Sequence, residues 1–305
     1  MPGTDRASLE ALADRFLGAV AARDPARAGL AANVRYTEDG QVLDVGDGLW
    51  GTADGIGSYK ALIVDPETGQ VGMFVTLREN GAPVILVARI KAVAGALTEI
   101  EVIVARGGFG PMANGAELLE KLDGPSPLWS QPVPPAERLS REALIAAADK
   151  YFWGLEKNAP GRDYSFFADD CVRLENGMAT TGNKDLRYGE GISERPIDDF
   201  MAAFAGMGAR EQFETGYFCF VDRIRDRRFP VVDVETGSVF TFVFFDHSGT
   251  IHRIPLADGR TIDGGVREPY TWELGEAFKI DKGKIAFVEA VMKRCPYGMK
   301  PNWPA

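Results

Sequence analysis

A twelve-residue segment that occurs twice constrains the fold of this chain more than any other feature of its sequence. Residues 64–75 read VDPETGQVGMFV and residues 232–243 read VDVETGSVFTFV, and eight of the twelve positions are identical. Self-similarity of this kind is typical of a structural unit that has been duplicated. The shared ETG element, in which acidic and Thr residues precede Gly, predicts a tight hairpin turn between two strands.

Two weaker echoes flank this repeat in the same order along the chain. Residues 34–38 (VRYTE) precede it in the first half, and residues 172–176 (VRLEN) precede it in the second. Residues 97–106 and 285–294 follow it, and each is an alternating strand that ends in a basic residue. Because three matches follow one another in the same order, we predict two copies of one unit.

Each copy begins with a predicted amphipathic helix and continues as strands. Apolar residues recur at helical spacing over residues 8–22, with Ser8 as a candidate N-cap, and again in the stretch that follows Ser140. The strand-like runs after each helix predict an α+β fold, with N-terminal helices packed on a curved, mostly antiparallel sheet in each repeat. The predicted domains are a first repeat at 1–106, an extended Pro/Gly-rich linker at 107–138, and an enlarged second repeat with a C-terminal tail at 139–305. The enlargement comes from insertions at 178–212, with a short helix over 196–206, and at 248–267.

Charge and cysteine content exclude several classes of protein. The formal net charge is −10, and the only dense basic cluster, at residues 223–228, is interrupted by aspartate. Nucleic acids and anionic membranes require a basic footprint, so neither partner is expected. The three scattered cysteines form neither a disulfide framework nor a metal pair and fit a reducing compartment. Without a signal-peptide pattern or a run of about 18 apolar residues, a cytoplasmic location is predicted.

The order of helix, turn and long meandering sheet resembles the SnoaL-like, or nuclear transport factor two-like, superfamily. The stretches VRYTEDGQVLDVGDGLWGT and RDRRFPVVDVETGSVFTFVFFDHSG are similar to those of a SnoaL-like family of tandem domains. The resemblance implies that each repeat is a cone, in which a curved sheet wraps around helices and opens into a mostly apolar pocket. It also implies cofactor-free proton transfer, as in the isomerases, cyclases, dehydratases and lyases of that superfamily, or non-catalytic binding, because fold alone does not decide function.

Several other chemistries lack their motifs. There is no GxGxxG after a strand, no GxxxxGK[ST] and no GxSxG. The Gly-rich residues 107–110 are not followed by a helical pattern, so we interpret them as a linker turn. Neither a cofactor nor a metal is predicted, since His247 and His252, the only histidines, are spaced for neither a helix face nor a strand face. A hairpin that brought them together with Asp246 would leave a metal site open as an alternative.

His247 is a candidate catalytic residue at the end of an apolar strand. Alternation along residues 241–247 places Val243, Phe245 and His247 on one face. An imidazole at the rim of such a strand suits a general acid or base. The alternative is a hydrogen-bonded histidine at a loop junction. His252 lies in a Gly-rich stretch, where exposure is favoured over substrate binding.

Arg173 and Glu175 are two further candidates for catalysis. They lie two residues apart on a predicted strand, so their side chains share one face. Arg35 and Thr37 hold a similar place in the first half, and a structural ion pair is the alternative interpretation. Glu99 and Glu101 also share a strand face, for which solvent exposure is favoured.

Aromatic residues supply the rest of the predicted site. Tyr270 and Trp272 share a strand face, and a tyrosine hydroxyl at the end of a pocket polarises a carbonyl or protonates a leaving hydroxyl. Most aromatic side chains in a chain of this size are core residues. The predicted substrate-binding residues are Trp272, Tyr217, Phe245, His252, Trp50 and Tyr59, and the predicted catalytic residues are His247, Tyr270, Glu175 and Arg173.

Two functions from different classes follow. The first is a cofactor-independent lyase, dehydratase or isomerase that uses general acid–base catalysis on a hydrophobic, aromatic or polyketide-like small molecule, with the site in the enlarged second repeat. The second is a non-catalytic module that binds a small molecule or a partner. In either case the two repeats are expected to pack as an intramolecular pseudo-dimer, and a further homo-oligomer remains open.

Overall fold

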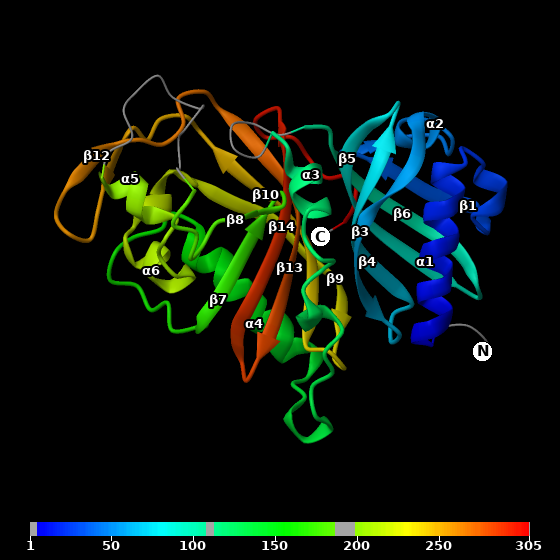
Figure 1. Cartoon of the computed structure of the whole chain (residues 1–305), viewed down its shortest axis with the longest axis horizontal. Coiled ribbons are helices and arrows are strands. Elements are labelled where there is room, and N and C mark those ends of the chain that lie inside the picture. The colour runs from blue at the N-terminus through cyan, green and yellow to red at the C-terminus, as the bar shows by residue number, and fades with distance from the viewer. Residues whose placement is uncertain (1–4, 108–112, 187–198, 305) are drawn as a thin grey trace.

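The computed structural model describes residues 5–107, 113–186 and 199–304. These ranges form two six-stranded sheets, a small two-stranded sheet and several helices (Figure 1). Each large sheet is antiparallel apart from one parallel pair of strands. The predicted α+β class is therefore confirmed. In the described ranges, no helix combines the length and apolarity needed to cross a bilayer.

The first half begins with a helix whose N-cap differs from the predicted one. Asp5 is the N-cap and accepts a hydrogen bond from the Ser8 amide (2.8 Å), so the helix begins at Arg6 rather than after Ser8. The elements of this half are α1 (Arg6–Ala21), η1 (Pro25–Arg27), β1 (Leu30–Glu38), β2 (Gln41–Val42), α2 (Leu49–Thr52), β3 (Ala53–Asp65), β4 (Gln70–Glu79), β5 (Ala82–Val93) and β6 (Ala96–Ala105).

The second half begins at the predicted cap. The Ser140 hydroxyl accepts a hydrogen bond from the Ala143 amide (3.2 Å) and starts the helix. The connecting segment contains α3 (Gly115–Glu120), η3 (Pro127–Trp129) and η4 (Pro135–Glu137). The second half contains α4 (Arg141–Leu155), β7 (Phe167–Glu175), β8 (Met178–Ala179), α5 (Asp199–Phe204), α6 (Ala209–Glu214), η5 (Tyr217–Phe220), β9 (Arg223–Asp233), β10 (Ser238–His247), β11 (Arg253–Pro255), β12 (Thr261–Asp263), β13 (Tyr270–Asp281) and β14 (Lys284–Cys295).

The two large sheets have the same strand order. The first runs β2-β1-β6-β5-β4-β3 and the second β8-β7-β14-β13-β10-β9, with the parallel pair in the same place. The second half adds α5 and α6 between β8 and β9, and the β11–β12 hairpin between β10 and β13, whereas η5 takes the place that α2 holds in the first half. The added elements fall in the predicted insertions at 178–212 and 248–267, except that α6 extends two residues beyond the first. The helix predicted over 196–206 is observed as α5, although residues 196–198 lie outside the described part of the chain.

The ETG repeat forms the predicted hairpin turn in both halves. Gly69 and Gly237 have φ of 70° and 67°, a conformation that glycine adopts without strain. The aspartate that opens each turn accepts hydrogen bonds from the turn itself, Asp65 from the Thr68 amide (3.2 Å) and Asp233 from the Thr236 amide (3.2 Å). The sequence repeat is thus a structural repeat.

The first echo is displaced by one residue from its predicted alignment. In both halves β1 and β7 end in a two-residue turn with positive φ, at Asp39 (52°) and at Asn176 (44°), each followed by glycine. This turn aligns Glu38 with Glu175 and Tyr36 with Arg173. Arg35 is therefore not the counterpart of Arg173, because a shift of one residue along a strand moves a side chain to the other face.

Three apolar clusters form the core, one within each half and one shared between them. Helix α1 covers one face of the first sheet, and α4 covers one face of the second (Figure 1). The remaining faces pack against each other around Phe74, Phe240 and Phe242. Each sheet is thus buried on both faces, and the second half is held to the first by a shared core.

Ion pairs across this interface are reciprocal. Arg6, the first residue of α1, binds Asp233 in the ETG turn of the second half (2.8 Å). Arg141, the first residue of α4, binds Asp65 in the ETG turn of the first half (2.7 Å). The same patch of each unit therefore contacts the same patch of the other, as in a twofold dimer.

Near the centre of the interface, equivalent positions carry side chains of opposite size. A Cβ added to Gly72 of β4 would lie 2.5 Å from the ring of Phe240, which occupies the same position in β10. A Cβ added to Gly275 of β13 would lie 2.2 Å from Cγ1 of Val87, its counterpart in β5. Small residues of one half thus receive large residues of the other.

We expect Gly275→Ala to lower the free energy of unfolding by about 1 to 3 kcal/mol, because the added methyl overpacks the interface against Val87. Adding Val87→Ala should recover part of the loss. Gly18→Ala in α1 is the matched control, since a Cβ there meets nothing within 4 Å. Urea denaturation of Gly275→Ala, Val87→Ala, the double variant and Gly18→Ala measures the effect. If the loss of stability in the double variant were the sum of the losses in the two single variants, the contact between residues 275 and 87 would be contradicted.

The interface also buries charged and polar groups. Glu101 of β6 binds Arg228 of β9 (3.0 Å) and Arg89 of β5 (3.2 Å), and all three are buried. The solvent exposure favoured for Glu101 from the sequence is therefore wrong, because the second sheet covers that face. Glu289 of β14 accepts hydrogen bonds from Tyr59 of β3 (2.8 Å) and, as described next, from the connecting segment.

The connecting segment is partly buried rather than wholly extended on the surface. Trp129 in η3 is 4% exposed and its indole N–H donates to Glu289 (2.8 Å). Leu119 in α3 is also buried in the shared core. The segment expected to be a surface linker therefore contributes to the packing of the two halves.

Candidate active site in the second half

One face of the second sheet carries all four predicted catalytic residues. This face is covered by α4, and its apolar residues include Val243 and Phe245 of β10 and Leu274 of β13. The alternation of each strand adds His247, Tyr270, Glu175 and Arg173 to the same face. The polar residues lie in two separate groups, one deep under α4 and one at the strand ends.

The deep group is built around Arg173 of β7. Its guanidinium forms an ion pair with Glu175, two residues along the same strand, and donates to Oε1 of Gln212 (2.8 Å). The amide of Gln212 in turn donates to the backbone carbonyls of Thr180 (2.6 Å) and Phe204 (2.9 Å). Helix α6, part of the first insertion, therefore fixes the arginine in place.

Glu276 of β13 brings a second carboxyl group to the same place. It pairs with Ala290 of β14, and Ala290 pairs with Glu175 of β7, so the two glutamates flank one strand. Two strand spacings place their Cα atoms about 10 Å apart. The small side chain of Ala290 leaves room above the sheet for both carboxyl groups to approach. Glu276 was not among the catalytic residues predicted from the sequence.

Burial sets the protonation state of Glu276. Its side chain is buried. Burial, together with the smaller effect of the charge of Glu175, raises the pKa from 4.5 to about 8, and the charge of Arg173 opposes the shift. The Tyr151 hydroxyl of α4 lies within hydrogen-bonding reach of this carboxyl, and the Oε2 atom has no hydrogen-bond partner. Glu276 is therefore a neutral acid at neutral pH, close to the ion-paired Glu175.

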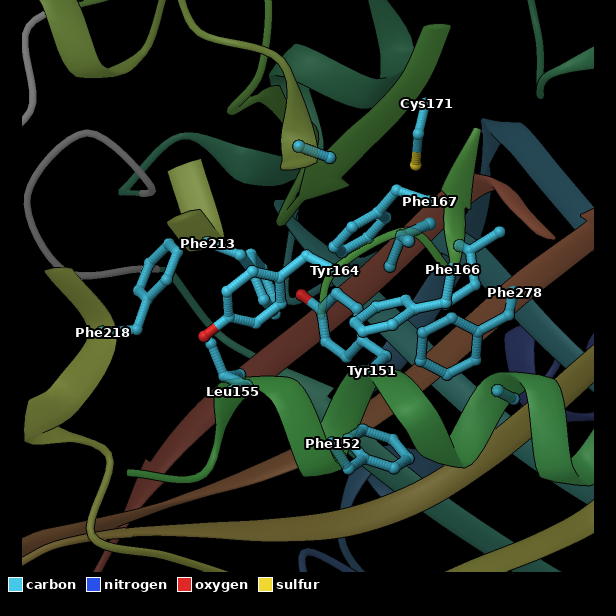
Figure 2. Close-up of a cluster of buried hydrophobic side chains, with 14 of the residues drawn as sticks. Tyr151, Phe152, Leu155, Tyr164, Phe166, Phe167, Cys171, Phe213, Phe218 and Phe278 are labelled. Atoms are coloured by element: carbon cyan, nitrogen blue, oxygen red, sulfur yellow. The ribbon is translucent and has the colours of Figure 1, made fainter. Parts of the chain in front are cut away.

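Aromatic rings enclose this group. The guanidinium of Arg173 faces the rings of Tyr151 (5.8 Å), Phe213 (5.6 Å) and Phe218 (5.3 Å). Figure 2 shows these rings gathered above α4 with Phe167 and Phe278 beside them. Such packing leaves the polar group in an apolar, water-poor setting, where electrostatic interactions are strong.

His247 and Tyr270 form the second group, at the strand ends. Their rings stack at 4.6 Å and the ring of Phe220 lies 6.0 Å from His247 on another side. Burial lowers the pKa of His247 from 6.5 to about 4, so the imidazole is neutral at neutral pH. Tyr270 lies six residues from Glu276 along β13, a separation of about 20 Å. The predicted catalytic residues therefore do not meet at one point.

The predicted substrate-binding residues are distributed over both halves. Trp272 packs edge-on against Tyr270 at 5.2 Å, and Phe245 and Tyr217 belong to the core under α4. His252 lies just before β11 and is partly buried. Trp50 is buried in the first half against Phe16, and Tyr59 is bound to Glu289 between the sheets. Trp50 and Tyr59 therefore lie away from the deep group.

The first half retains only one of the two carboxyl groups. Glu38, the counterpart of Glu175, accepts hydrogen bonds from the Tyr36 hydroxyl (2.8 Å) and from Arg106 (2.6 Å). The hairpins β5–β6 and β13–β14 align Ala88 with Glu276. With alanine at that position the first half has no second acid, so the acid pair is a feature of the second half.

Alternation along β13 contains the signal that identifies Glu276. It shares a strand face with Tyr270 and Trp272, both selected from the sequence. The helical spacing of apolar residues after Ser140 places Tyr151 on the apolar face of α4, and the structure confirms that position. Only the packing of α4 on the sheet brings Tyr151 to Glu276, and helical periodicity carries no information about that contact.

The described side chains leave the deep group covered. A shallow pocket of about 680 Å³ lies on the outside of the second half, between α4 and β9, and is lined by residues such as Ile145, Arg227 and Phe229. None of the predicted site residues lines it. Access to Glu276 therefore requires movement of the aromatic residues that surround it.

Comparison with known proteins gives one family. Residues 137–292, slightly more than half of the chain, match the model of a family described as a domain of unknown function (DUF8021). No match was found among curated proteins. One solved structure that matches is the crystal structure of a de novo designed protein with a curved β-sheet, 16% identical, with coverage of 51% of this chain and 88% of that chain and a TM-score of 0.26. A TM-score this low carries no argument about the fold.

Proposed function

This chain belongs to the family of the domain of unknown function DUF8021, and we propose that it is a cofactor-independent lyase or isomerase whose site is the Arg173–Glu175–Tyr151–Glu276 group. The observation that carries the proposal is the pair of inward-facing glutamates that flank Ala290. One is ion-paired, and burial keeps the other neutral. Two carboxyl groups with opposite protonation states in one site supply a base and an acid.

The roles follow from these protonation states. Glu175, held by Arg173, removes a proton from a carbon atom of the substrate. Neutral Glu276 and the Tyr151 hydroxyl donate hydrogen bonds to the oxygen on which charge develops. In an elimination, Glu276 passes its proton to the leaving hydroxyl as the carbon–oxygen bond breaks. In an isomerisation, the proton taken by Glu175 returns to another carbon atom.

The walls of the site indicate the class of substrate. Three aromatic rings surround the polar group, and the charge of Arg173 is balanced by Glu175. A buried anion or cation on the substrate would have no counter-charge, and its desolvation would oppose binding. We therefore assign a neutral, hydrophobic substrate with a carbonyl or hydroxyl oxygen, of the aromatic or polyketide-like kind.

We also propose that each half has the fold of SnoaL-like proteins. Each half is then a cone formed by one six-stranded sheet and its helices, and the second cone holds the site. The identical strand order of the two sheets supports this view. The three cysteines are free thiols, which supports placement in the cytoplasm.

Glu276→Gln should lower turnover by about 10² to 10⁴-fold, because the amide cannot transfer a proton. The assay is a mass-spectrometric screen of small aromatic diols, ketones and polyketide-like compounds for loss of water or formaldehyde, or for rearrangement. Glu38→Gln, at the position equivalent to Glu175 in the first half, is the control and should retain turnover. In the wild type, turnover should fall as pH rises through about 8 and Glu276 ionises. Undiminished turnover by Glu276→Gln would exclude this assignment.

A non-catalytic binding module is the second candidate. The tight aromatic packing around Glu276 favours it, because it leaves no open pocket beside the acid pair in the described residues. Under this function, compounds from the same screen would bind and be recovered unchanged. The Glu276→Gln variant would then alter affinity without any effect on product.

A further inference from the structure

One short segment covers both polar groups of the second half. The ring of Phe218 in η5 lies over the Arg173 guanidinium (5.3 Å), and the ring of Phe220, two residues later, lies 6.0 Å from His247. Three of the four residues of η5 are aromatic. The equivalent of η5 in the first half is α2, at the same offset as the ETG repeat, and its one aromatic residue, Trp50, packs on Tyr36 (5.9 Å), the counterpart of Arg173.

The attachment of η5 is weak compared with that of the sheet beneath it. Three of its hydrogen bonds stay within residues 215–221: from the Tyr217 amide to Oγ1 of Thr215 (3.1 Å), from Cys219 to the Gly216 carbonyl (3.3 Å) and from Val221 to the Phe218 carbonyl (2.9 Å). The hydrogen bond from the Phe218 amide to the Asn158 side chain (3.2 Å) connects the segment to the rest of the second half. The turn begins after Gly216, whose φ is 77°. Tyr217 and Phe220 remain partly exposed. Segments with few backbone bonds and exposed edges open at a lower free energy than the whole domain.

We propose that η5 is a lid that opens as a unit, and that a planar aromatic compound then replaces the Phe218 ring on the Arg173 guanidinium. This inference rests on the proposed function only in that both place the site at Arg173. An aromatic ring is the required replacement, because the π-face of Phe218 is attracted to the buried cation. A saturated ring of the same size fills the space without that attraction.

Amide hydrogen exchange measures the opening directly. In the full-length protein, the Phe218 and Val221 amides should exchange well before those of β10 and β13. Saturating 2-naphthol should accelerate their exchange further, because it binds the open form, whereas most ligands slow exchange. Decahydro-2-naphthol, the saturated counterpart, should leave it unchanged. The proposal would be overturned if the amides of η5 exchanged only together with those of the sheets. It would also be overturned if 2-naphthol slowed their exchange.

Phe218→Leu gives a second, independent measurement. Leucine keeps the bulk of the lid but removes its π-face, so the affinity for 2-naphthol should rise roughly threefold to tenfold. The control is Phe166→Leu, a buried ring of the same core that packs on Tyr164 and Phe167. Equal affinities in the two variants would also overturn the proposal. Loss of 2-naphthol binding in both would do the same.

The lid and the reaction can fail separately. If η5 opens and binds 2-naphthol but no compound in the screen is converted, the lid stands and the proposed function falls. If compounds are converted while η5 exchanges only with the sheets, the reverse holds. The Glu276→Gln variant should still bind 2-naphthol, because the contact that exchanges is the one with Arg173.

Discussion

Glu101→Gln is expected to lower the free energy of unfolding by about 3 to 5 kcal/mol. The carboxylate of Glu101 is the shared partner of Arg89 and Arg228, and all three side chains are buried between the sheets. The amide keeps the shape of the side chain but removes the counter-charge of the buried Arg228 guanidinium and leaves Arg89 with the partly exposed Glu99. Urea denaturation followed by circular dichroism measures the loss.

Glu99→Gln is the matched control for this prediction. Glu99 lies two residues away on the same strand and binds the same Arg89 (2.6 Å), but its side chain is 27% exposed. Ion pairs that water reaches contribute little, so the control should lose about 1 kcal/mol or less. Equal losses in the two variants would show that burial of the Arg89–Glu101–Arg228 group is not what stabilises the interface.

The second large effect is a loss of stability as pH rises, caused by buried glutamates. Burial raises the pKa of Glu276 to about 8 and that of Glu289 to about 7, both from 4.5. Between pH 4.5 and these values the folded protein binds more protons than the unfolded chain, so the stability present at low pH is lost as pH rises. Each group accounts for about 3 to 5 kcal/mol over that range.

A variant with both Glu276→Gln and Glu289→Gln isolates this effect. Its free energy of unfolding, relative to the wild type, should increase steadily between pH 5 and pH 9, because glutamine has no charge to bury. Glu137→Gln, on the exposed connecting segment, should track the wild type at every pH. A constant difference between the double variant and the wild type would contradict the assignment of these two groups.

The sequence repeat predicted two similar, mostly antiparallel sheets for a physical reason. The ETG turn requires glycine at positive φ, so its two occurrences mark the same hairpin in both halves. Ser140 is likewise the observed helix cap. Ser8 is not, because Asp5 stands three residues earlier and accepts the hydrogen bond from the Ser8 amide. Local signals of this kind identify elements and leave their ends uncertain by a few residues.

Contacts between elements were the part that the sequence could not supply. Alternation places Glu101 on one face of its strand, but whether water or a second sheet covers that face depends on the partner half. For the same reason Glu276 was missed and His247 was grouped with Arg173. Strand periodicity assigns all of them to one face, whereas their separation depends on the register between β10, β13 and β14.

The unequal side chains at the centre of the interface determine which halves can pair. Two copies of the first half would set Gly72 against Gly72 and leave a void, and two copies of the second would drive Phe240 into Phe240. Because the two halves are parts of one chain, each half meets its unlike partner at a high effective concentration. Pairing between like halves is therefore not needed to bury these surfaces. Two chains can still exchange whole halves, since each unlike pair would be preserved, so any dimer built on this surface is a swapped one.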